Sequence, residues 1–469
     1  MKSPFRRVPN ITPPALITVV YGQSRTTHTE GVGMCWTGGG ALNPCIAQVP
    51  DRCLMMNNAS APGWNENNGF NTAAWTPSIP SSLVPLRDCW LGNRATGWQG
   101  SSSDPLGQSL GTMMWKLDAN DVAAGGALRN RVYLAAGRGG KRIAWLMPQT
   151  GTPPSGSLAP NGITFYQNML AMVQKAKDYC VSQLKMPARI ESVLWLQGEA
   201  DYNVGTSYAV YKANLLSLIA SMRTDLAAIT GDSTPFPFIM DQVASDQKGG
   251  GNPASLAQLD IALENSDGNT YCIGANYSYP YNANVSLDGD STGTAHMISE
   301  QQAAWGEAFA AGRLAIAGGG SPQKTYVNPA TPGAIVTVGN VVTITPTIAA
   351  PPLVLDTTIP IALNYGFKLR DPGGATIAGV VVGATTITVT LSAAPSAGAT
   401  LEYSYENPAG TSVTQTGQPF TNGVVDLVGT PAFTAGAWGN IRDSRAVTST
   451  YGAPLKIYNW LCIGQWSIA

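Results

Sequence analysis

The sequence predicts an α/β fold built on a parallel sheet, followed by an antiparallel β-sandwich. From residue 15 to about residue 316, short apolar β-branched runs alternate with amphipathic helical stretches. This alternation is typical of a parallel sheet with helices on both faces. After residue 322, apolar and polar residues alternate with a period of two, and turn residues separate these alternating stretches. That second pattern is typical of antiparallel strands with one buried face.

The first strand is predicted at residues 15–21, which read Ala-Leu-Ile-Thr-Val-Val-Tyr. Residues 25–105 are loop-rich and contain turn signals such as Asn67-Asn68-Gly69. Long excursions at the carboxyl end of a strand often build the walls of a binding site. Regular alternation then resumes, with strands expected at 131–136, 190–196 and 236–240 and helices at 165–185, 208–226 and 299–316.

Residues 318–322, Gly-Gly-Gly-Ser-Pro, predict a flexible linker. Period-two runs such as 334–338 and 386–391 place an antiparallel β-sandwich at residues 323–410. Residues 411–469 are rich in Gly, Thr and aromatic residues and predict a small C-terminal β segment. We therefore expect residues 1–317 to form a domain that folds and functions on its own.

Composition excludes several classes of protein. Charged residues make up 12% of the chain and the formal net charge is -1, so there is no basic surface for nucleic acid. The basic first residues are followed by an apolar stretch that Asn10, Pro13 and Pro14 interrupt. We therefore expect no signal peptide, no membrane-spanning helix, and neither nucleic acid nor membrane as a partner.

The cysteines and histidines give no metal-ligand spacing, so we expect no metal site and no cofactor. The seven cysteines include no Cys-x-x-Cys pair, and four of them fall between Cys35 and Cys89. One or two disulfides there, or free buried thiols, are both compatible with the sequence.

A serine follows the first predicted strand, in the triplet Gly22-Gln23-Ser24. The carboxyl ends of parallel strands are where α/β folds bind their ligands. A serine hydroxyl becomes a good nucleophile only beside a base, usually histidine, and the chain has two histidines, His28 and His296. Ser24 is therefore a candidate nucleophile. A serine in a loop or at a helix cap would show the same local sequence, so this alternative stays open.

A second polar block follows the strand at 190–196, and with it a family resemblance emerges. Residues 195–201 read Trp-Leu-Gln-Gly-Glu-Ala-Asp, and Ala295-His296-Met297 comes later. With Gly-Gln-Ser-Arg at 22–25, these blocks resemble the SGNH hydrolases, in the branch of sialate O-acetylesterases and acetylxylan esterases. Residues 104–107 and 139–145 resemble two further blocks of that branch. The resemblance covers about residues 15–314 and implies a three-layer, flavodoxin-like parallel-sheet esterase domain.

The resemblance assigns roles to individual residues. Ser24 would be the nucleophile that forms an acyl-enzyme, and His296 would be its general base. His28, only four residues from Ser24, would point elsewhere in a tight loop. The backbone amides of Ser24 and Gly107 and the side-chain amide of Gln197 would stabilise the oxyanion. Gln197 could instead be a structural hydrogen-bonding residue at the end of its strand.

The acid that orients the histidine departs from the family pattern. Many relatives have aspartate three residues before the histidine, where this chain has Gly293. Glu199 is the favoured substitute, Asp290 is the alternative, and a Ser-His dyad without an acid is the third option. Arg25 stands where the family has asparagine, and together with Gln23 it is expected to contact substrate.

The resemblance also implies a substrate and a setting. The branch removes acetyl groups from sugar hydroxyls, so an O-acetylated polysaccharide is the expected partner. The β-rich part resembles immunoglobulin-like repeats of bacterial surface proteins, and the whole arrangement resembles a phage virion-associated esterase such as a tail spike or fibre. A homo-oligomer or other virion proteins would then be further partners. The alternatives are a non-catalytic glycan-binding virion protein with a degenerate site, and a secreted or cytoplasmic deacetylase with a carbohydrate-binding module.

Overall fold

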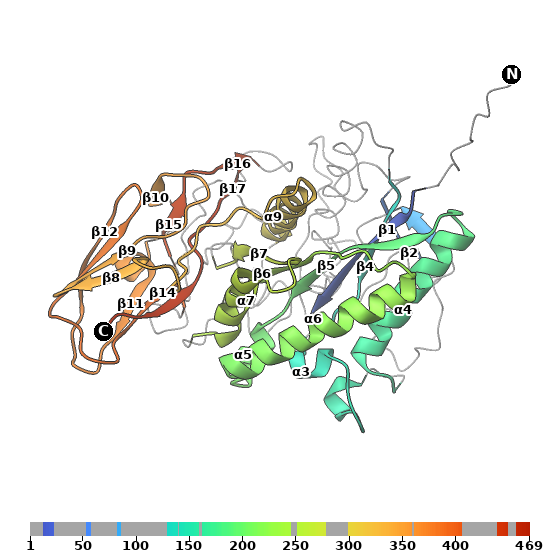
Figure 1. Ribbon diagram of the computed structural model, residues 1–469, viewed down its shortest axis with the longest axis horizontal. Coiled ribbons are helices and arrows are strands. Elements are labelled where there is room, and N and C mark those ends of the chain that lie inside the picture. The colour runs from blue at the N-terminus through green and yellow to red at the C-terminus, as the bar shows by residue number, and fades with distance from the viewer. Residues whose placement is uncertain are drawn as a thin grey trace, which may run out of the picture.

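The protein was analysed as a computed structural model, which describes residues 13–22, 53–57, 82–85, 129–138, 140–158, 162–244, 251–277, 299–358, 361–405, 439–448 and 456–469. Two regions follow one another along the chain (Figure 1). The first is a sheet flanked by helices, and the second consists of antiparallel sheets. This arrangement confirms the fold class predicted from the sequence.

The sheet of the first region has seven strands among the described residues, in the order β3-β2-β4-β1-β5-β6-β7. All neighbouring strands run parallel except β2 and β3, which are antiparallel. Without β2 and β3, the remaining order follows the flavodoxin-like winding. The strand bounds are β1 Ala15–Gly22, β2 Cys53–Asn57, β3 Ser82–Pro85, β4 Arg131–Ala135, β5 Ala188–Leu196, β6 Phe238–Gln242 and β7 Thr270–Ala275.

Strands β2 and β3 are the described parts of the long segment at residues 25–105, whose loop-rich character stays a prediction. They extend the sheet beyond β4 and pair with each other in a register that joins Met55 to Val84. Both strands are only four or five residues long. In segments of this length, apolar residues show no recognisable periodicity, so the sequence does not indicate a strand and pairing with a neighbouring strand determines the conformation.

Helices cover both faces of the sheet. On one face, Ile17, Val19 and Tyr21 of β1 belong to a core with residues of α4 (Phe165–Ser182), α6 (Tyr208–Thr230) and α7 (Pro253–Glu264). On the other face, Val20 belongs to a core with Trp305 and Phe309 of α9 (Ser299–Ala317). Successive side chains of a strand point to opposite faces of the sheet, so the side chains of β1 point alternately toward the two cores.

A buried ion pair ties α9 to the middle of the sheet. Glu191 of β5 lies 3.2 Å from the guanidinium of Arg131 in β4, and both side chains are 2% exposed. The same carboxylate accepts a hydrogen bond of 3.2 Å from the Thr18 hydroxyl of β1. Arg313 of α9 approaches it to 3.9 Å. One carboxylate therefore connects the three central strands with the helix that covers them.

The second region contains antiparallel sheets, as predicted. One has the order β12-β13-β9-β8, another β11-β14-β18, and two pairs are β10-β15 and β16-β17. The strands are β8 Ile335–Val338, β9 Val341–Ile344, β10 Leu353–Leu355, β11 Phe367–Arg370, β12 Ile377–Val382, β13 Ile387–Leu391, β14 Thr400–Tyr403, β15 Ile441–Asp443, β16 Val447–Thr448, β17 Lys456–Ile457 and β18 Gly464–Ser467. β15 and β18 pair with β10 and β14, so the last residues complete the same sheets as residues 353–403.

The segment expected to be a flexible linker ends a helix. The amides of Gly318, Gly319 and Gly320 donate hydrogen bonds to the carbonyls of residues 314–316 in the last turn of α9. Gly319 has φ +80°, a left-handed conformation that glycine adopts easily at a helix end. The backbone between the two regions is therefore hydrogen-bonded to α9. The division of the chain into the domains 1–317, 323–410 and 411–469 stays a prediction.

Apolar packing continues across this junction. One core cluster contains Leu196 of the sheet, Phe309 of α9, and Tyr403 and Trp460 of the β-rich region. Two hydrogen bonds reinforce it: the Gln242 amide nitrogen donates to the carbonyl of Ile463 at 2.8 Å, and the Ile463 amide donates to Gln242 Oε1 at 2.7 Å. The fully buried Gln242 side chain thus pairs with the last segment as a neighbouring strand would.

Among the helices of the described residues, none has both the length and the apolar composition needed to cross a bilayer.

The Gln242 contact predicts that the two regions unfold together. Gln242→Met keeps the volume but leaves the buried amide and carbonyl of Ile463 without partners, which should lower the free energy of unfolding by about 3 kcal/mol. Urea denaturation followed by tryptophan fluorescence should show one transition, shifted to lower urea.

Gln465→Met is the matched control. Gln465 is exposed and donates to Glu402 within the β-rich region, so its loss should cost less than about 1 kcal/mol. Two separate transitions in the wild type, or equal effects of the two substitutions, would contradict a shared unfolding unit.

Candidate active site

The winding of the sheet reverses between β1 and β5. The strands that follow β1 in the chain, β2 to β4, lie on one side of it, whereas β5 and the strands after it lie on the other side. In doubly wound sheets, ligands bind at such a reversal, outside the carboxyl ends of the strands. Gly22, the last residue of β1, pairs with Leu196, the last residue of β5. The two motifs singled out in the sequence therefore begin at adjacent positions on this edge.

Two glycines let the chain leave the sheet here. Gly22 has φ +147°, and a Cβ atom at this position would overlap the carbonyl oxygen of Leu196. Gly198 has φ +145°, and its Cβ would lie 2.5 Å from Cγ1 of Val243. Side chains at either position are excluded both by the backbone conformation and by space. Glycine at 22 and 198 is thus a requirement of the strand ends.

Gln197, a candidate oxyanion donor, is fully buried and already hydrogen-bonded. Its amide nitrogen donates to the carboxylate of Asp201 and, at 3.3 Å, to the carbonyl oxygen of Lys141. Its Oε1 accepts from the Tyr211 hydroxyl at 2.9 Å. Both hydrogens of the side-chain amide are thus donated to groups of the protein. This favours the alternative in which Gln197 is a structural hydrogen-bonding residue. A donor role toward an oxyanion would require the longer bond, to Lys141, to be given up.

Asp201 joins two of the sequence blocks. Its carboxylate accepts hydrogen bonds from the Ile143 amide at 2.7 Å and from the Thr206 hydroxyl at 2.8 Å, besides that from Gln197. Ile143 begins the short helix α3 (Ile143–Leu146), so the block at 139–145 is fixed against the block at 195–201. Burial raises the pKa of Asp201 above its ordinary value, and these hydrogen bonds oppose that rise. Asp201 is part of the block at 195–201, but the sequence pattern alone predicted no role for it.

Tyr211 and Gln258 complete the support behind the strand end. The Trp195 indole and the Gln258 amide donate to the Tyr211 hydroxyl at 3.3 and 3.2 Å. Gln258 also donates to the carbonyl of Gln197 at 2.7 Å and accepts from the Val243 amide at 2.8 Å. Burial raises the pKa of Tyr211 well above its ordinary value, so the phenol stays neutral. Sequence reasoning missed Tyr211 because it lies on α6, where helical spacing indicates only packing, and it missed Gln258 because α7 was not predicted.

Glu199, the favoured orienting acid, is the first residue of the short helix α5 (Glu199–Asn203) and is 6% exposed. It lies close enough to Tyr211 to contribute to the raised pKa of that phenol. A nearly buried carboxylate at the carboxyl end of the strand next to β1 matches the location expected for it. The other predicted site residues, Gln23, Ser24, Arg25, Gly107, Asp290 and His296, lie outside the described residues, as does the competing His28.

Comparison with known proteins identifies the family. Residues 72–314 match the family described as carbohydrate esterase, sialic acid-specific acetylesterase, and this span is just over half of the 469 residues. The chain belongs to this family. Membership supports an esterase that hydrolyses acetyl esters on carbohydrates. The match contains Gln197, Glu199 and the position of His296, but it begins after Ser24. The prediction that Ser24 is the nucleophile therefore depends on its sequence position, two residues after the end of β1.

Three solved structures are similar to this chain. A carbohydrate acetylesterase from Xanthomonas citri aligns with 96% of this chain and 80% of its own, with a TM-score of 0.52 and 13% identity. NanS aligns with 66% of this chain and 100% of its own, with a TM-score of 0.42 and 14% identity. A protein from Arabidopsis thaliana aligns with 64% and 98%, with a TM-score of 0.39 and 18% identity. The first of these likenesses shows the fold. No curated protein sequence matches the chain.

The Asp201 network predicts a specific loss of stability. In Asp201→Asn, one donor among Ile143, Gln197 and Thr206 faces an amide NH₂ and loses its acceptor. The free energy of unfolding should therefore fall by about 2 kcal/mol. Because the folded pKa of Asp201 is raised, its stabilising contribution is complete at low pH and declines as pH rises from the ordinary carboxyl pKa through the folded one. The cost of the substitution should therefore be smaller near neutral pH than in acid.

Asp260→Asn is the matched control, since Asp260 accepts one hydrogen bond, from the Tyr208 hydroxyl, on the partly exposed surface. Equal losses for the two variants in urea titrations, at every pH, would contradict the special role of Asp201.

Proposed function

We propose that this protein is a serine esterase that removes O-acetyl groups from a carbohydrate through an acyl-enzyme, with Ser24 as nucleophile. The observation that carries the proposal is the pairing of Gly22 with Leu196 at the reversal of the winding. Ser24 follows Gly22 by two residues, and Gln197 and Glu199 follow Leu196 directly in the family's own block. The serine motif and the family motif therefore begin side by side.

In the proposed reaction, the Ser24 hydroxyl attacks the acetyl carbonyl while His296 takes its proton. The tetrahedral intermediate collapses when His296 returns this proton to the departing sugar hydroxyl, which leaves an acetyl-serine. Water, deprotonated by His296, then attacks the acetyl carbonyl. His296 returns this proton to Ser24 Oγ as the ester bond to the serine breaks, which releases acetic acid and restores the free hydroxyl. The backbone amides of Ser24 and Gly107 are the proposed oxyanion donors. Gln197 joins them only if it exchanges its bond with Lys141 for one with the intermediate.

Glu199 is the proposed orienting acid. A carboxylate there would hold the His296 imidazole in the tautomer that accepts the proton and would stabilise the imidazolium. Its near-complete burial supports this role, because Coulomb attraction is stronger away from water. Asp290 remains the alternative. Arg25 and Gln23 are the proposed substrate contacts beside the nucleophile.

The proposed setting is a phage virion, with the esterase on a tail spike or fibre that strips acetyl groups from host surface polysaccharide. The sequence resemblance alone supports this setting, and a secreted enzyme is the alternative. Copies of this chain or other virion proteins would then be its partners. A glycan-binding protein with a degenerate site is the competing function, favoured by Arg25 and by Gly293 in place of the usual residues.

Removal of either proposed catalytic side chain should abolish turnover. Ser24→Ala and His296→Ala should each lower kcat for p-nitrophenyl acetate by about 10⁴ or more, because nucleophile and base act as one unit. His28→Ala is the control and should keep wild-type turnover. Wild-type activity in either of the first two variants, at equal folded content by circular dichroism, would refute the assignment. A wild-type protein that binds acetylated polysaccharide without releasing acetate would favour the competing function.

The orienting acid can be tested by isosteric substitution. Glu199→Gln should lower kcat by about 10³ to 10⁴, because the imidazole loses its preferred tautomer, while Asp290→Asn should change it little. The reverse ranking would transfer the role to Asp290. Two small effects would indicate a Ser-His dyad.

A further inference from the structure

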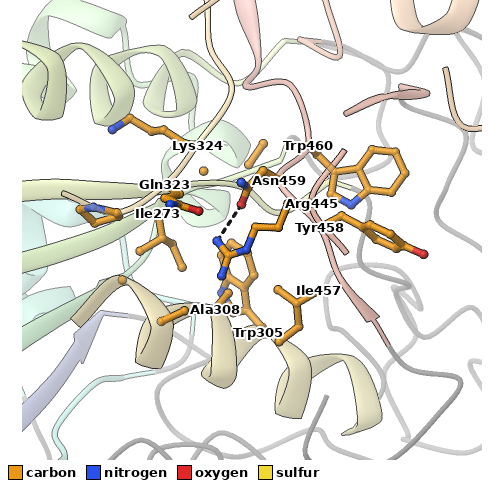
Figure 2. A pocket seen from close by; sticks show the side chains of 15 residues that line it. Ile273, Trp305, Ala308, Gln323, Lys324, Arg445, Ile457, Tyr458, Asn459 and Trp460 are labelled. Carbon is orange, nitrogen blue, oxygen red and sulfur yellow. Dashed lines mark hydrogen bonds between the residues drawn. The ribbon is translucent and has the colours of Figure 1, made fainter. Parts of the chain in front are cut away.

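A small cavity lies where α9, the end of β7 and the last segment of the chain, residues 456–469, meet (Figure 2). The helix lines it with Ala308, Ala311 and Gly312, which lie on one side of α9 because they are three and four residues apart. These residues are too small to fill the space against Ile273 of β7 and Trp460 of the last segment. The cavity measures about 30 Å³, which is room for one or two waters or for a single group of two or three heavy atoms.

The charged side chains around this cavity are all positive. Lys324 and Arg445 line it, and none of the described residues that line it is acidic. The ammonium group of Lys324 lies 5.2 Å from the ring centroid of Tyr326. Within the described ranges, neither cation forms an ion pair with a carboxylate. Two cations without a counter-charge beside an apolar cavity favour an anion as the ligand.

The guanidinium of Arg445 is suited to hold that anion. Its Nη1 donates to Oδ1 of Asn459 at 3.2 Å, and the part of the chain that the structure describes provides no other hydrogen bond to this side chain. Figure 2 shows the guanidinium among the lining side chains, next to Asn459. A guanidinium carries five N–H donors in a planar fork, which matches the two oxygens of a carboxylate. A carboxylate, with three heavy atoms, is also a group of the size that the cavity admits.

Asn459 and Asp443 hold Arg445 in place. Asn459 is 8% exposed, and its Nδ2 donates to Oδ2 of Asp443 at 3.0 Å. The fully buried Asp443 also accepts from the Thr325 hydroxyl at 3.0 Å and from the backbone amide of Arg445 at 2.9 Å. Asp443 therefore fixes the backbone of residue 445 and the amide that orients the guanidinium. An arginine held in this way loses little conformational freedom when it binds a ligand.

The cavity lies at the same edge of the sheet as the proposed active site. Ile273 and Ala275, which line it, are among the last residues of β7. The strands β1, β5, β6 and β7 are parallel, so their carboxyl ends share this edge. β7 is the third strand from β1, and neighbouring strands are about 4.8 Å apart, so roughly 14 Å separate the two strand ends. One acetylated sugar is too short to reach both places, whereas a polysaccharide chain can extend over both.

We propose that Arg445 and Lys324 form a binding site for a carboxylate of an acidic polysaccharide. This carboxylate belongs to a different sugar residue from the one that carries the acetyl ester. The proposal rests on the proposed function, because Ser24 determines where the ester lies. The carboxylate enters the cavity and accepts hydrogen bonds from Arg445, and its sugar ring stays outside because the cavity is too small for it. The β-rich region, which supplies Arg445, thereby contributes to the choice of polymer.

Titration calorimetry with oligosaccharides that carry no acetyl groups tests the site directly. Oligomers of galacturonate or of glucuronate should bind to the full-length protein, whereas neutral oligomers of xylose should bind much more weakly. Arg445→Gln should weaken uronate binding by about tenfold or more, because a hydrogen-bonded charge pair is lost. Lys456→Gln is the matched control: it removes the same charge from an exposed residue beside the cavity that does not line it, so the affinity should stay within about twofold.

Acetate release provides the second readout. Arg445→Gln should lower the ratio of kcat/KM for acetylated polygalacturonate to kcat/KM for acetylated xylan by about the same factor, and Lys456→Gln should leave this ratio unchanged. The proposal would be overturned if no uronate oligomer bound to the wild type at millimolar concentration, or if Arg445→Gln bound it as the wild type does. Equal losses in the two variants, or equally tight binding of inorganic phosphate, would also overturn it. The calorimetric result does not depend on turnover, so full activity in Ser24→Ala would refute the proposed function alone.

Discussion

The close pairing of β1 with β5 is the constraint on which the site depends. The backbone of residue 22 lies so near the carbonyl of Leu196 that no side chain fits, and Gly198 is limited in the same way by Val243. The backbone can adopt its conformation at residues 22 and 198 only because both residues are glycine. The proposed nucleophile, Ser24, and the proposed orienting acid, Glu199, come one or two residues after these two glycines.

The polar support behind the strand ends determines what Gln197 can do. Asp201, Tyr211 and Lys141 together use the donors and the acceptor of its side chain. Such a satisfied buried network holds a strand end in one arrangement, and partial removal is costly because it leaves polar groups unpaired. The rigid edge that results is suited to an enzyme, because catalysis needs groups whose positions are settled before the substrate arrives.

The sequence predicted the elements whose pattern is local. β1 and β5 are buried on both faces and appear as apolar runs, and α4 shows helical spacing and begins with the capping pair Thr164 and Gln167. α7 was not predicted, although Asn252 followed by Pro253 is a recognisable helix start. β7 is a short run interrupted by a glycine and was missed as well.

Long-range contacts could not be predicted from one sequence. The role of Asp201 depends on an amide of residue 143, and that of Gln242 depends on the backbone of residue 463. The glycines at 318–320 have the composition of a linker, yet their amides end α9. Composition indicates how flexible a segment would be in isolation. Contacts with the elements before and after the segment determine whether it is flexible in the folded protein. The shared core joins the β-rich region to the sheet and to α9, and the alignment with the Xanthomonas citri esterase likewise extends over 96% of this chain.

The most direct measurement is to locate the nucleophile chemically. The full-length protein would be treated with a fluorophosphonate, which bonds to the activated serine of a serine hydrolase, and the modified peptide would be identified by mass spectrometry. The account predicts one adduct per molecule, on Ser24, and no adduct after His296→Ala. An adduct on another serine, or none in a preparation that releases acetate, would contradict it.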